Sequence, residues 1–156
     1  MLSGTTAVDL ITAAPADPEV DTFTAMNQAF APTRTDFDWL SRDPDEVDRY
    51  VADSLCGFMV EGASVASMGA AGQVFSQPEA IARVRADLPI YVFSGDRDPV
   101  GADGKGVELV GARYREGGVE DVVVRLYPEA RHELLNETNR DEVTADFLAW
   151  AGRFTG

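Results

Sequence analysis

The sequence predicts an α/β fold in which a small parallel sheet follows a mainly helical region. Two apolar runs, "LPIYVFSG" at residues 88–95 and "VVVRLY" at residues 122–127, have the length and composition of buried strands. Helical patterns cover residues 104–118, between the two runs, and residues 139–154, after the second. Strand, helix, strand and helix in this order imply parallel pairing with right-handed crossovers.

Residues 1–86 are expected to be mainly helical, and residues 87–156 to hold the strands. In the first part, "PEVDTFTAMNQAF" places apolar residues at helical spacing. A second helix is predicted from "DPDEVDRYVADSL", because Asp43 can cap it, Pro44 fits its first turn and Glu46 completes a capping box. The apolar stripe of this helix consists of Val47, Tyr50 and Val51.

The two later helices carry similar signals. In the helix between the strands, the residues predicted to face inward are Val107, Val110 and Tyr114. Gly117 is predicted to end that helix. The last helix is expected to begin with a capping box formed by Asn139 and Glu142. Its apolar face consists of Val143, Phe147 and Trp150.

Length and composition exclude several classes of protein. The chain has 156 residues, 45% of them hydrophobic, which suits one ordinary domain, and no stretch is apolar enough to span a membrane. The net charge of −14 repels phosphate backbones and anionic lipid surfaces, so we expect no nucleic-acid partner. Cys56 is the single cysteine, and the first basic residue is Arg34, so neither an internal disulfide nor a secretory signal is indicated. A cytoplasmic location is expected.

Polar side chains follow both predicted strands at their carboxyl ends. Asp98 comes after the first strand, and His132, the only histidine, comes after the second. Ligands of parallel sheets bind beyond these ends. A histidine can transfer a proton near neutral pH, and a carboxylate on its other ring nitrogen fixes the tautomer. Asp98 and His132 could therefore be a catalytic pair, although a single histidine after a strand is often only a surface or capping residue.

The sequence around this pair resembles a known group of enzymes. "LPIYVFSGDRDPVG" followed by "LYPEARHELLNET" is similar to the last two strand ends of α/β-hydrolases of the monoacylglycerol lipase, lysophospholipase and serine aminopeptidase group. "NQAFAPTRTDFDWLSRDPDEVDRYVADSLCGF" resembles the lid of a bacterial lysophospholipase-like branch of that group. The resemblance extends over the whole chain. It implies the carboxyl-terminal part of an α/β-hydrolase fold, preceded by a mainly helical lid.

The resemblance also implies roles for individual residues. Asp98, rather than Asp96, matches the acid of the family's catalytic triad, and His132 matches the base. Aromatic residues of the lid could line a pocket for an acyl chain, or could simply form the core of the lid. These candidate substrate-binding residues are Phe30, Phe37, Trp39 and Phe58.

Other types of site fit the same region poorly. "DRDPVGADGKGV" resembles a calcium loop, but Val100 occupies a ligand position and Val107 stands where a glutamate is needed. "GADGKG" lacks the first glycine and the hydroxyl residue of a phosphate-binding loop. One histidine and one distant cysteine cannot form a closed zinc site. We therefore expect no cofactor and no metal.

The nucleophile of the family is not found in this sequence. In this fold a serine precedes the acid and the base in a G-x-S-x-G motif, which does not occur in the 156 residues. Ser64 in "GASVA" and Ser67 in "VASMGA" each lack one glycine of the motif, and we expect both in a polar loop of the lid. The opening "LSGTT" resembles the end of the strand that enters the lid, so the nucleophile is expected before Met1.

Two functions remain open at this point. The first is a serine hydrolase that acts on carboxylic esters with lipid or lysophospholipid-like acyl groups, in which a serine from elsewhere attacks the carbonyl, His132 transfers its proton and Asp98 orients His132. The second is an inert fragment or a non-catalytic subunit that pairs with another chain. In both cases we expect the isolated, truncated chain to be inactive. Its uncovered sheet should self-associate or bind an amino-terminal partner segment.

Overall fold

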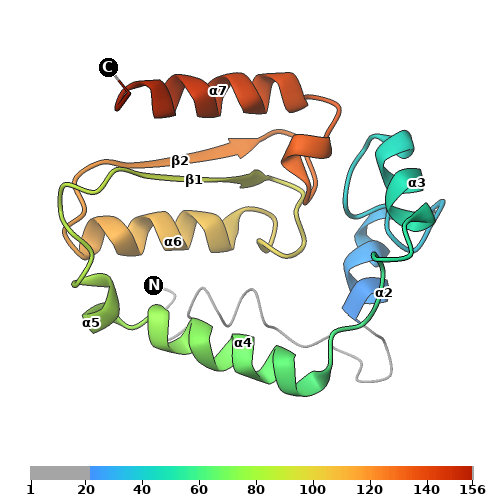
Figure 1. The fold of residues 1–156 in the computed structure, drawn as a ribbon, viewed down its shortest axis with the longest axis horizontal. Coiled ribbons are helices and arrows are strands. Elements are labelled where there is room, and N and C mark those ends of the chain that lie inside the picture. The colour runs from blue at the N-terminus through green and yellow to red at the C-terminus, as the bar shows by residue number, and fades with distance from the viewer. Residues whose placement is uncertain (1–21, 156) are drawn as a thin grey trace.

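The computed structural model describes residues 22–155 and places a helical segment before the strands (Figure 1). The helical segment (residues 22–81) contains α2 (Thr22–Asn27), the 3-10 helix η1 (Gln28–Phe30), α3 (Pro44–Ala52), α4 (Gly62–Phe75) and α5 (Pro78–Ile81). The later elements are β1 (Ile90–Gly95), α6 (Lys105–Glu116), β2 (Val122–Tyr127), the 3-10 helix η2 (Leu134–Asn136) and α7 (Arg140–Gly152).

The two strands form the predicted parallel pair. Ile90 lies opposite Val122, and Gly95 lies opposite Tyr127. Helix α6 covers one face of this sheet and α7 covers the other (Figure 1). Because the strands are parallel, the loops after Gly95 and Tyr127 leave the sheet at the same edge.

The core lies between the sheet and the helices on its two faces. Toward α7 the buried apolar side chains are Tyr127, Ala130, Leu134 and Val143. Complete burial of one such large side chain contributes roughly 1.5–3 kcal/mol to stability. On the other face, α6 approaches the sheet closely at Gly111, where an added Cβ would lie 2.2 Å from Cγ2 of Val124. A glycine therefore sets the distance between α6 and β2.

The predicted capping of α3 is confirmed for Asp43 and Pro44 but not for Glu46. The Asp43 side chain accepts a hydrogen bond of 3.1 Å from the backbone N–H of Asp45, and Pro44 is the first helical residue. Glu46 does not complete the capping box, because its carboxylate pairs with Arg49 and Arg140 instead. The ion pairs with Arg140 join α3 to the start of α7.

Two local predictions were wrong. Residues 62–75 form helix α4 and not a polar loop, because alanine, methionine and glutamine favour a helix even without an apolar stripe. Asn139 does not cap α7 with its side chain, because its Oδ1 accepts from the Arg42 guanidinium at 2.9 Å, while its Nδ2 donates to the Glu142 carboxylate at 3.0 Å. The predicted strand end at "LSGTT" lies outside the described residues. Within residues 22–155 no helix combines the length and apolarity that a membrane span needs.

Candidate active site

Asp98 and His132 meet at the carboxyl edge of the sheet. The Nδ1 atom of His132 lies 3.0 Å from Oδ1 of Asp98, although 34 positions separate the two residues. Asp98 follows β1 and His132 follows β2, and the pairing of Gly95 with Tyr127 brings these two loops together. The parallel register therefore produces the contact that the strand ends predict.

The Asp98 carboxylate is buried, and both of its oxygens accept hydrogen bonds. It is 6% exposed, its Oδ1 also accepts from the Val100 N–H at 2.9 Å, and its Oδ2 accepts from the Ser94 hydroxyl at 3.1 Å. Burial raises the pKa of Asp98, but its hydrogen bonds and the charge of His132 together lower this pKa below the usual value. An ionised carboxylate can only accept, so Nδ1 of His132 carries the proton and donates it.

The imidazole of His132 is packed on one side and open on the other. Its ring centroid lies 5.1 Å from that of Trp39, and the side chain is 36% exposed. Burial lowers the pKa of His132, but the hydrogen bond with Asp98 and the charges of Asp98 and Glu133 raise it overall. Across residues 22–155 no hydrogen bond involves Nε2 of this ring. This nitrogen is therefore available to accept a proton from a bound group.

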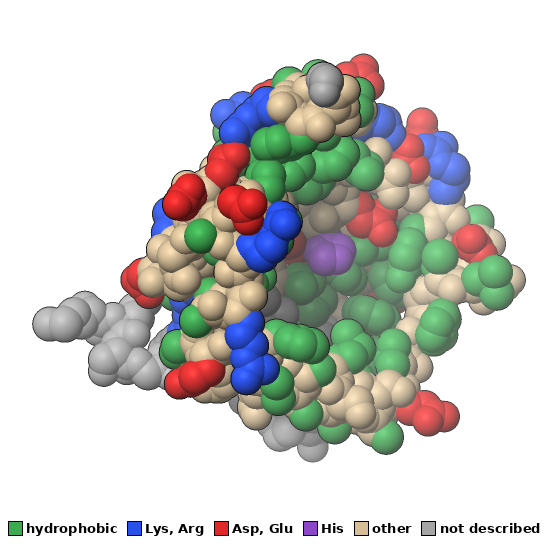
Figure 2. Space-filling model, turned by 60° about the vertical axis from the view of Figure 1, so that its left-hand side comes forward, with side chains coloured by type: hydrophobic (Ala, Val, Ile, Leu, Met, Phe, Trp, Pro, Cys, Tyr) green, Lys and Arg blue, Asp and Glu red, His purple; other side chains and the backbone are tan. Residues whose placement is uncertain are grey.

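A hollow lies in front of the imidazole. Figure 2 shows the histidine at its floor, with hydrophobic side chains on the surrounding walls. A pocket of about 350 Å³ includes the imidazole and is lined by Phe93, His132, Glu133, Leu134, Leu135 and Asn136. Since Phe93, Leu134 and Leu135 are apolar, this pocket suits an apolar group held beside His132.

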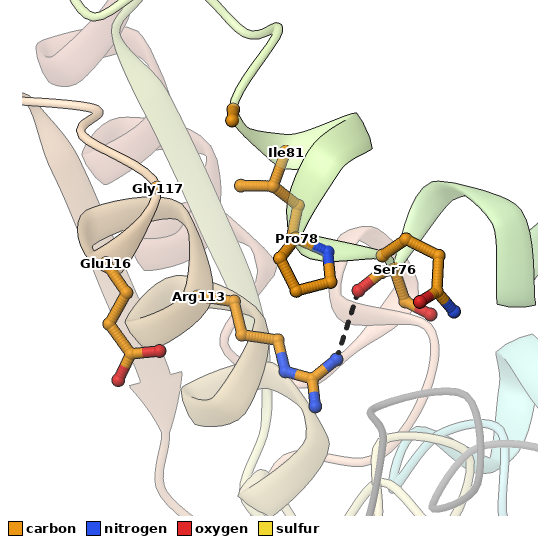
Figure 3. Close-up of a pocket in the computed structure, with 8 residues that line it drawn as sticks. Ser76, Pro78, Ile81, Arg113, Glu116 and Gly117 are labelled. Atoms are coloured by element: carbon orange, nitrogen blue, oxygen red, sulfur yellow. Dashed lines mark hydrogen bonds between the residues drawn. The ribbon is translucent and has the colours of Figure 1, made fainter.

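A larger pocket of about 480 Å³ lies away from the pair (Figure 3). It is formed where the end of α4, α5 and the end of α6 meet. The Arg113 guanidinium crosses it and donates to the backbone carbonyl of Ser76 at 3.3 Å. Neither Asp98 nor His132 lines this pocket, whereas His132 lines the smaller one.

The four predicted aromatic residues occupy different environments. Trp39 is buried against the His132 ring, and Phe30 packs under the Arg131 guanidinium at 4.2 Å. Phe58 is 66% exposed and lies on the surface. The rings that pack on Phe37 are those of Phe23 and Tyr50. Only Trp39 touches the imidazole directly among these four residues.

Asp96 and the two serines of α4, Ser64 and Ser67, lie outside the contact with His132. Oδ1 of Asp96 accepts a hydrogen bond of 2.7 Å from the Glu129 N–H, so Asp96 stabilises the turn after β2. Ser64 and Ser67 are exposed on α4, which follows no strand in the described part of the chain. No hydrogen bond within that part joins either serine to His132.

Sequence reasoning missed Glu137, whose carboxylate is completely buried five residues after His132. It accepts hydrogen bonds from Arg42, Arg131 and Thr138. The residue lies just after the short 3-10 helix η2, where no helical or strand periodicity exists. A pattern of spacing therefore could not have indicated that this glutamate is buried.

Comparison with known proteins gives consistent matches. The family described as serine aminopeptidase, S33, matches residues 10–139. Over 119 residues the chain is 34% identical to a monoacylglycerol lipase of Mycolicibacterium smegmatis, a match that covers 74% of this chain and 39% of the lipase. The chain thus spans about two fifths of the length of this relative.

Two solved structures resemble the fold. One is a highly thermostable carboxyl esterase from Bacillus coagulans in complex with glycerol, with a TM-score of 0.73 and 30% identity over 81% of this chain and 42% of the esterase. The other is a lipase in its open form, with a TM-score of 0.68 and 25% identity over 94% of this chain and 49% of the lipase.

The fold and these matches lead to the same assignment. The parallel strands β1 and β2, covered by α6 and α7, form part of an α/β-hydrolase fold, as the sequence predicts. Because the match to the family extends over most of the residues, from position 10 to position 139, the chain belongs to the serine aminopeptidase S33 family of α/β-hydrolases.

Proposed function

We propose that His132 and Asp98 are the base and the acid of a serine hydrolase that acts on carboxylic esters. The observation that carries this proposal is the 3.0 Å hydrogen bond from His132 Nδ1 to the buried Asp98 carboxylate, with Nε2 left without a partner in the described chain. The choice of esters is supported by the relatives, which are a monoacylglycerol lipase, a carboxyl esterase and a lipase.

The proposed reaction uses each ring nitrogen for one task. Nε2 of His132 removes the proton from a serine hydroxyl as that oxygen attacks the acyl carbonyl, and the proton then passes to the leaving alkoxide. Water repeats the cycle and releases the carboxylic acid. Asp98 holds Nδ1–H throughout and stabilises the imidazolium that forms.

The serine itself is proposed to come from another segment or chain. The sequence contains no G-x-S-x-G motif, and Ser64 and Ser67 lie within a helix instead of at a turn between a strand and a helix. The alternative, a non-catalytic subunit, shares the need for a partner. The many exposed apolar side chains favour this alternative, because they suit an interface with a partner. In such a subunit Asp98 and His132 would still be hydrogen-bonded but would have no catalytic role.

The helical segment is proposed to act as a lid that receives the acyl chain. Trp39 supports this role, because it is buried and its ring packs on the imidazole of His132, which lines the pocket. Phe30 contributes indirectly, since it packs on Arg131, the residue before His132. Phe37 packs on Tyr50, and Phe58 is exposed, so neither contacts the imidazole. In the proposed acyl site these two residues would contact only the part of a bound acyl chain that extends away from His132.

A chimera tests the proposed function. This chain replaces the matching segment of the Mycolicibacterium lipase, which supplies the remaining part of the enzyme. The chimera should hydrolyse p-nitrophenyl butyrate, and His132→Ala and Asp98→Asn should each lower kcat by about 10⁴-fold. Asp96→Asn is the matched control and should leave kcat nearly unchanged, because an asparagine oxygen can still accept from Glu129.

The outcome that contradicts the proposal is a folded His132→Ala chimera that keeps full activity. The isolated chain should show no turnover above background, because removal of the nucleophile leaves only weak residual catalysis. Clear turnover by the isolated chain that disappears in Ser67→Ala would instead identify the serine of α4 as the nucleophile.

A further inference from the structure

A second buried carboxylate lies close to the catalytic pair but does not touch it. Glu137 is 0% exposed. Its Oε1 accepts from the backbone N–H groups of Arg131 at 2.8 Å and Arg42 at 3.1 Å. Its Oε2 accepts from Arg42 Nε at 2.8 Å, from the Thr138 N–H at 2.9 Å and from the Thr138 hydroxyl at 3.4 Å. Both oxygens are therefore surrounded by donors.

These donors belong to separate parts of the chain. Arg131 immediately precedes His132 in the loop after β2, and Arg42 belongs to the helical segment. The same two stretches are also joined by backbone hydrogen bonds from the two residues that follow Arg131. The His132 N–H donates to the Trp39 carbonyl at 3.4 Å, and the Glu133 N–H donates to the Leu40 carbonyl at 2.8 Å. Residues 39–42 thus run beside residues 131–133.

Glu137 is held in its ionised form, which suits a carboxylate that accepts hydrogen bonds from two separate stretches of the chain. Burial raises the pKa of Glu137, but the N–H groups of Arg131, Thr138 and Arg42 and the Arg42 guanidinium lower it below the usual value. The carboxylate therefore stays ionised and presents only acceptors to its donors. A glutamine in its place would turn an NH₂ group toward N–H donors and would leave some of them without a partner.

We propose that Glu137 is a positioning residue for His132, which it holds against Asp98 by fixing the Arg131 N–H and the residue 39–42 stretch. The effect on catalysis rests on the proposed function. The effect on the hydrogen bond between His132 and Asp98 can be measured without turnover. Loss of Glu137 should let the loop that carries His132 move. A displacement of about 1 Å at a catalytic group can reduce a rate by roughly 10²-fold.

Another set of contacts joins nearly the same elements and provides a matched control. Arg140, the first residue of α7, pairs with Asp43 and Glu46 of the helical segment. These ion pairs stabilise the packing of the helical segment on the start of α7, but they involve no residue of the loop 131–133. Glu46→Gln therefore weakens the same packing without releasing His132.

The experiment uses the full chain labelled with ¹⁵N and ¹³C only at histidine, so that His132 gives one set of signals. Two readouts are measured in the unmodified chain, Glu137→Gln, Glu46→Gln and Asp98→Asn: the pKa of His132 and the far-downfield signal of its Nδ1 proton. In Glu137→Gln the pKa should fall toward the value in Asp98→Asn, and the Nδ1 signal should broaden or disappear. In Glu46→Gln both should stay as in the unmodified chain. Asp98 and Glu133, the charged groups that act on His132, remain present in both glutamate variants.

Each outcome decides a different point. A folded Glu137→Gln chain with an unchanged pKa and Nδ1 signal would overturn the inference and leave Glu137 a purely structural residue. If Glu137→Gln does not fold, Arg42→Ala, which removes one donor to the same carboxylate, decides in its place and should show a smaller change in the same direction. Absence of the Nδ1 signal in the unmodified chain would contradict the pair itself. A normal signal with an inactive chimera would contradict the ester hydrolase alone.

Discussion

The contact between Asp98 and His132 determines how each residue ionises. Asp98 is buried and His132 is partly open, so the carboxylate stabilises a proton on the imidazole more effectively than water does. The pKa of His132 is accordingly raised above 6.5, and that of Asp98 is lowered below 3.8. A base with a raised pKa reaches its neutral, active form only at a higher pH.

The first residue-scale prediction concerns this titration. Because the chain has one histidine, an NMR titration of an untagged sample reports His132 alone. Its pKa should lie above 6.5, and Asp98→Asn should lower it, since the hydrogen bond and the charge that raise it are lost. The control is Asp96→Asn, whose carboxylate bonds to Glu129 instead. A His132 pKa that does not respond to Asp98→Asn would show that the two side chains do not interact in solution.

The second residue-scale prediction concerns stability against pH. The raised pKa of His132 means that its contribution is complete below about 6.5 and is lost as the pH rises through its folded pKa. The lowered pKa of Asp98 means that its contribution is present above about 3.8 and is lost as the pH falls through its folded pKa. Urea denaturation should therefore show that Asp98→Asn destabilises the chain more at ~pH 5 than at ~pH 9. Equal destabilisation at both pH values would contradict this linkage.

At the scale of elements, strong local signals identified most of the fold. Strand β2 was predicted at its observed bounds, and β1, α3, α6 and α7 within a few residues. These elements have either a continuous apolar run or a clear apolar stripe such as Val47, which is 2% exposed. Helix α4 was missed because its sequence is apolar and small on every side, so it has no periodic pattern.

The candidate site was predictable only in part, for a related reason. Asp98 and His132 follow apolar runs, and parallel strands bring their ends together, so sequence order was enough to place them. Glu137 and Arg42 meet through irregular segments that are 95 positions apart. No local rule relates such segments, and a glutamate is usually exposed. The residues that position the loop of His132 therefore became visible only in three dimensions.

The prediction at this scale compares two helical glycines. Among residues 22–155, a Cβ at Gly69 of α4 would meet nothing within 4 Å, so Gly69→Ala should raise the free energy of unfolding by about 0.5–1 kcal/mol through helix propensity. A Cβ at Gly111 of α6 would lie 2.2 Å from the side chain of Val124. Overpacking by this methyl group should cost ~1–3 kcal/mol, which exceeds the gain in helix propensity from glycine to alanine. Gly111→Ala should therefore destabilise the chain. Urea denaturation of both variants measures the difference, and a stabilising Gly111→Ala would show that α6 packs less closely on β2.

For the whole molecule, apolar surface and net charge act against each other. No residue of α4 is buried, and Met68 and Phe75 on this helix are 70% and 73% exposed. Strand β1 pairs with β2 alone in a two-stranded sheet, so its other edge has no strand in the described chain. Exposed apolar patches and open strand edges both promote association. The net charge of −14 opposes it through repulsion between copies.

The last prediction follows from this opposition. At micromolar concentration the isolated chain should form dimers or larger species by light scattering, and the association should strengthen as salt is added. Salt shortens the range of charge repulsion from about 30 Å at 0.01 M to about 10 Å at 0.1 M but leaves apolar attraction intact. Met68→Gln combined with Phe75→Gln should reduce association without altering the net charge, whereas Leu148→Gln on α7, across the sheet from α6 and α4, should have less effect (Figure 1). A monodisperse monomer at both salt concentrations, with a cooperative thermal transition, would contradict the idea that these surfaces need a partner.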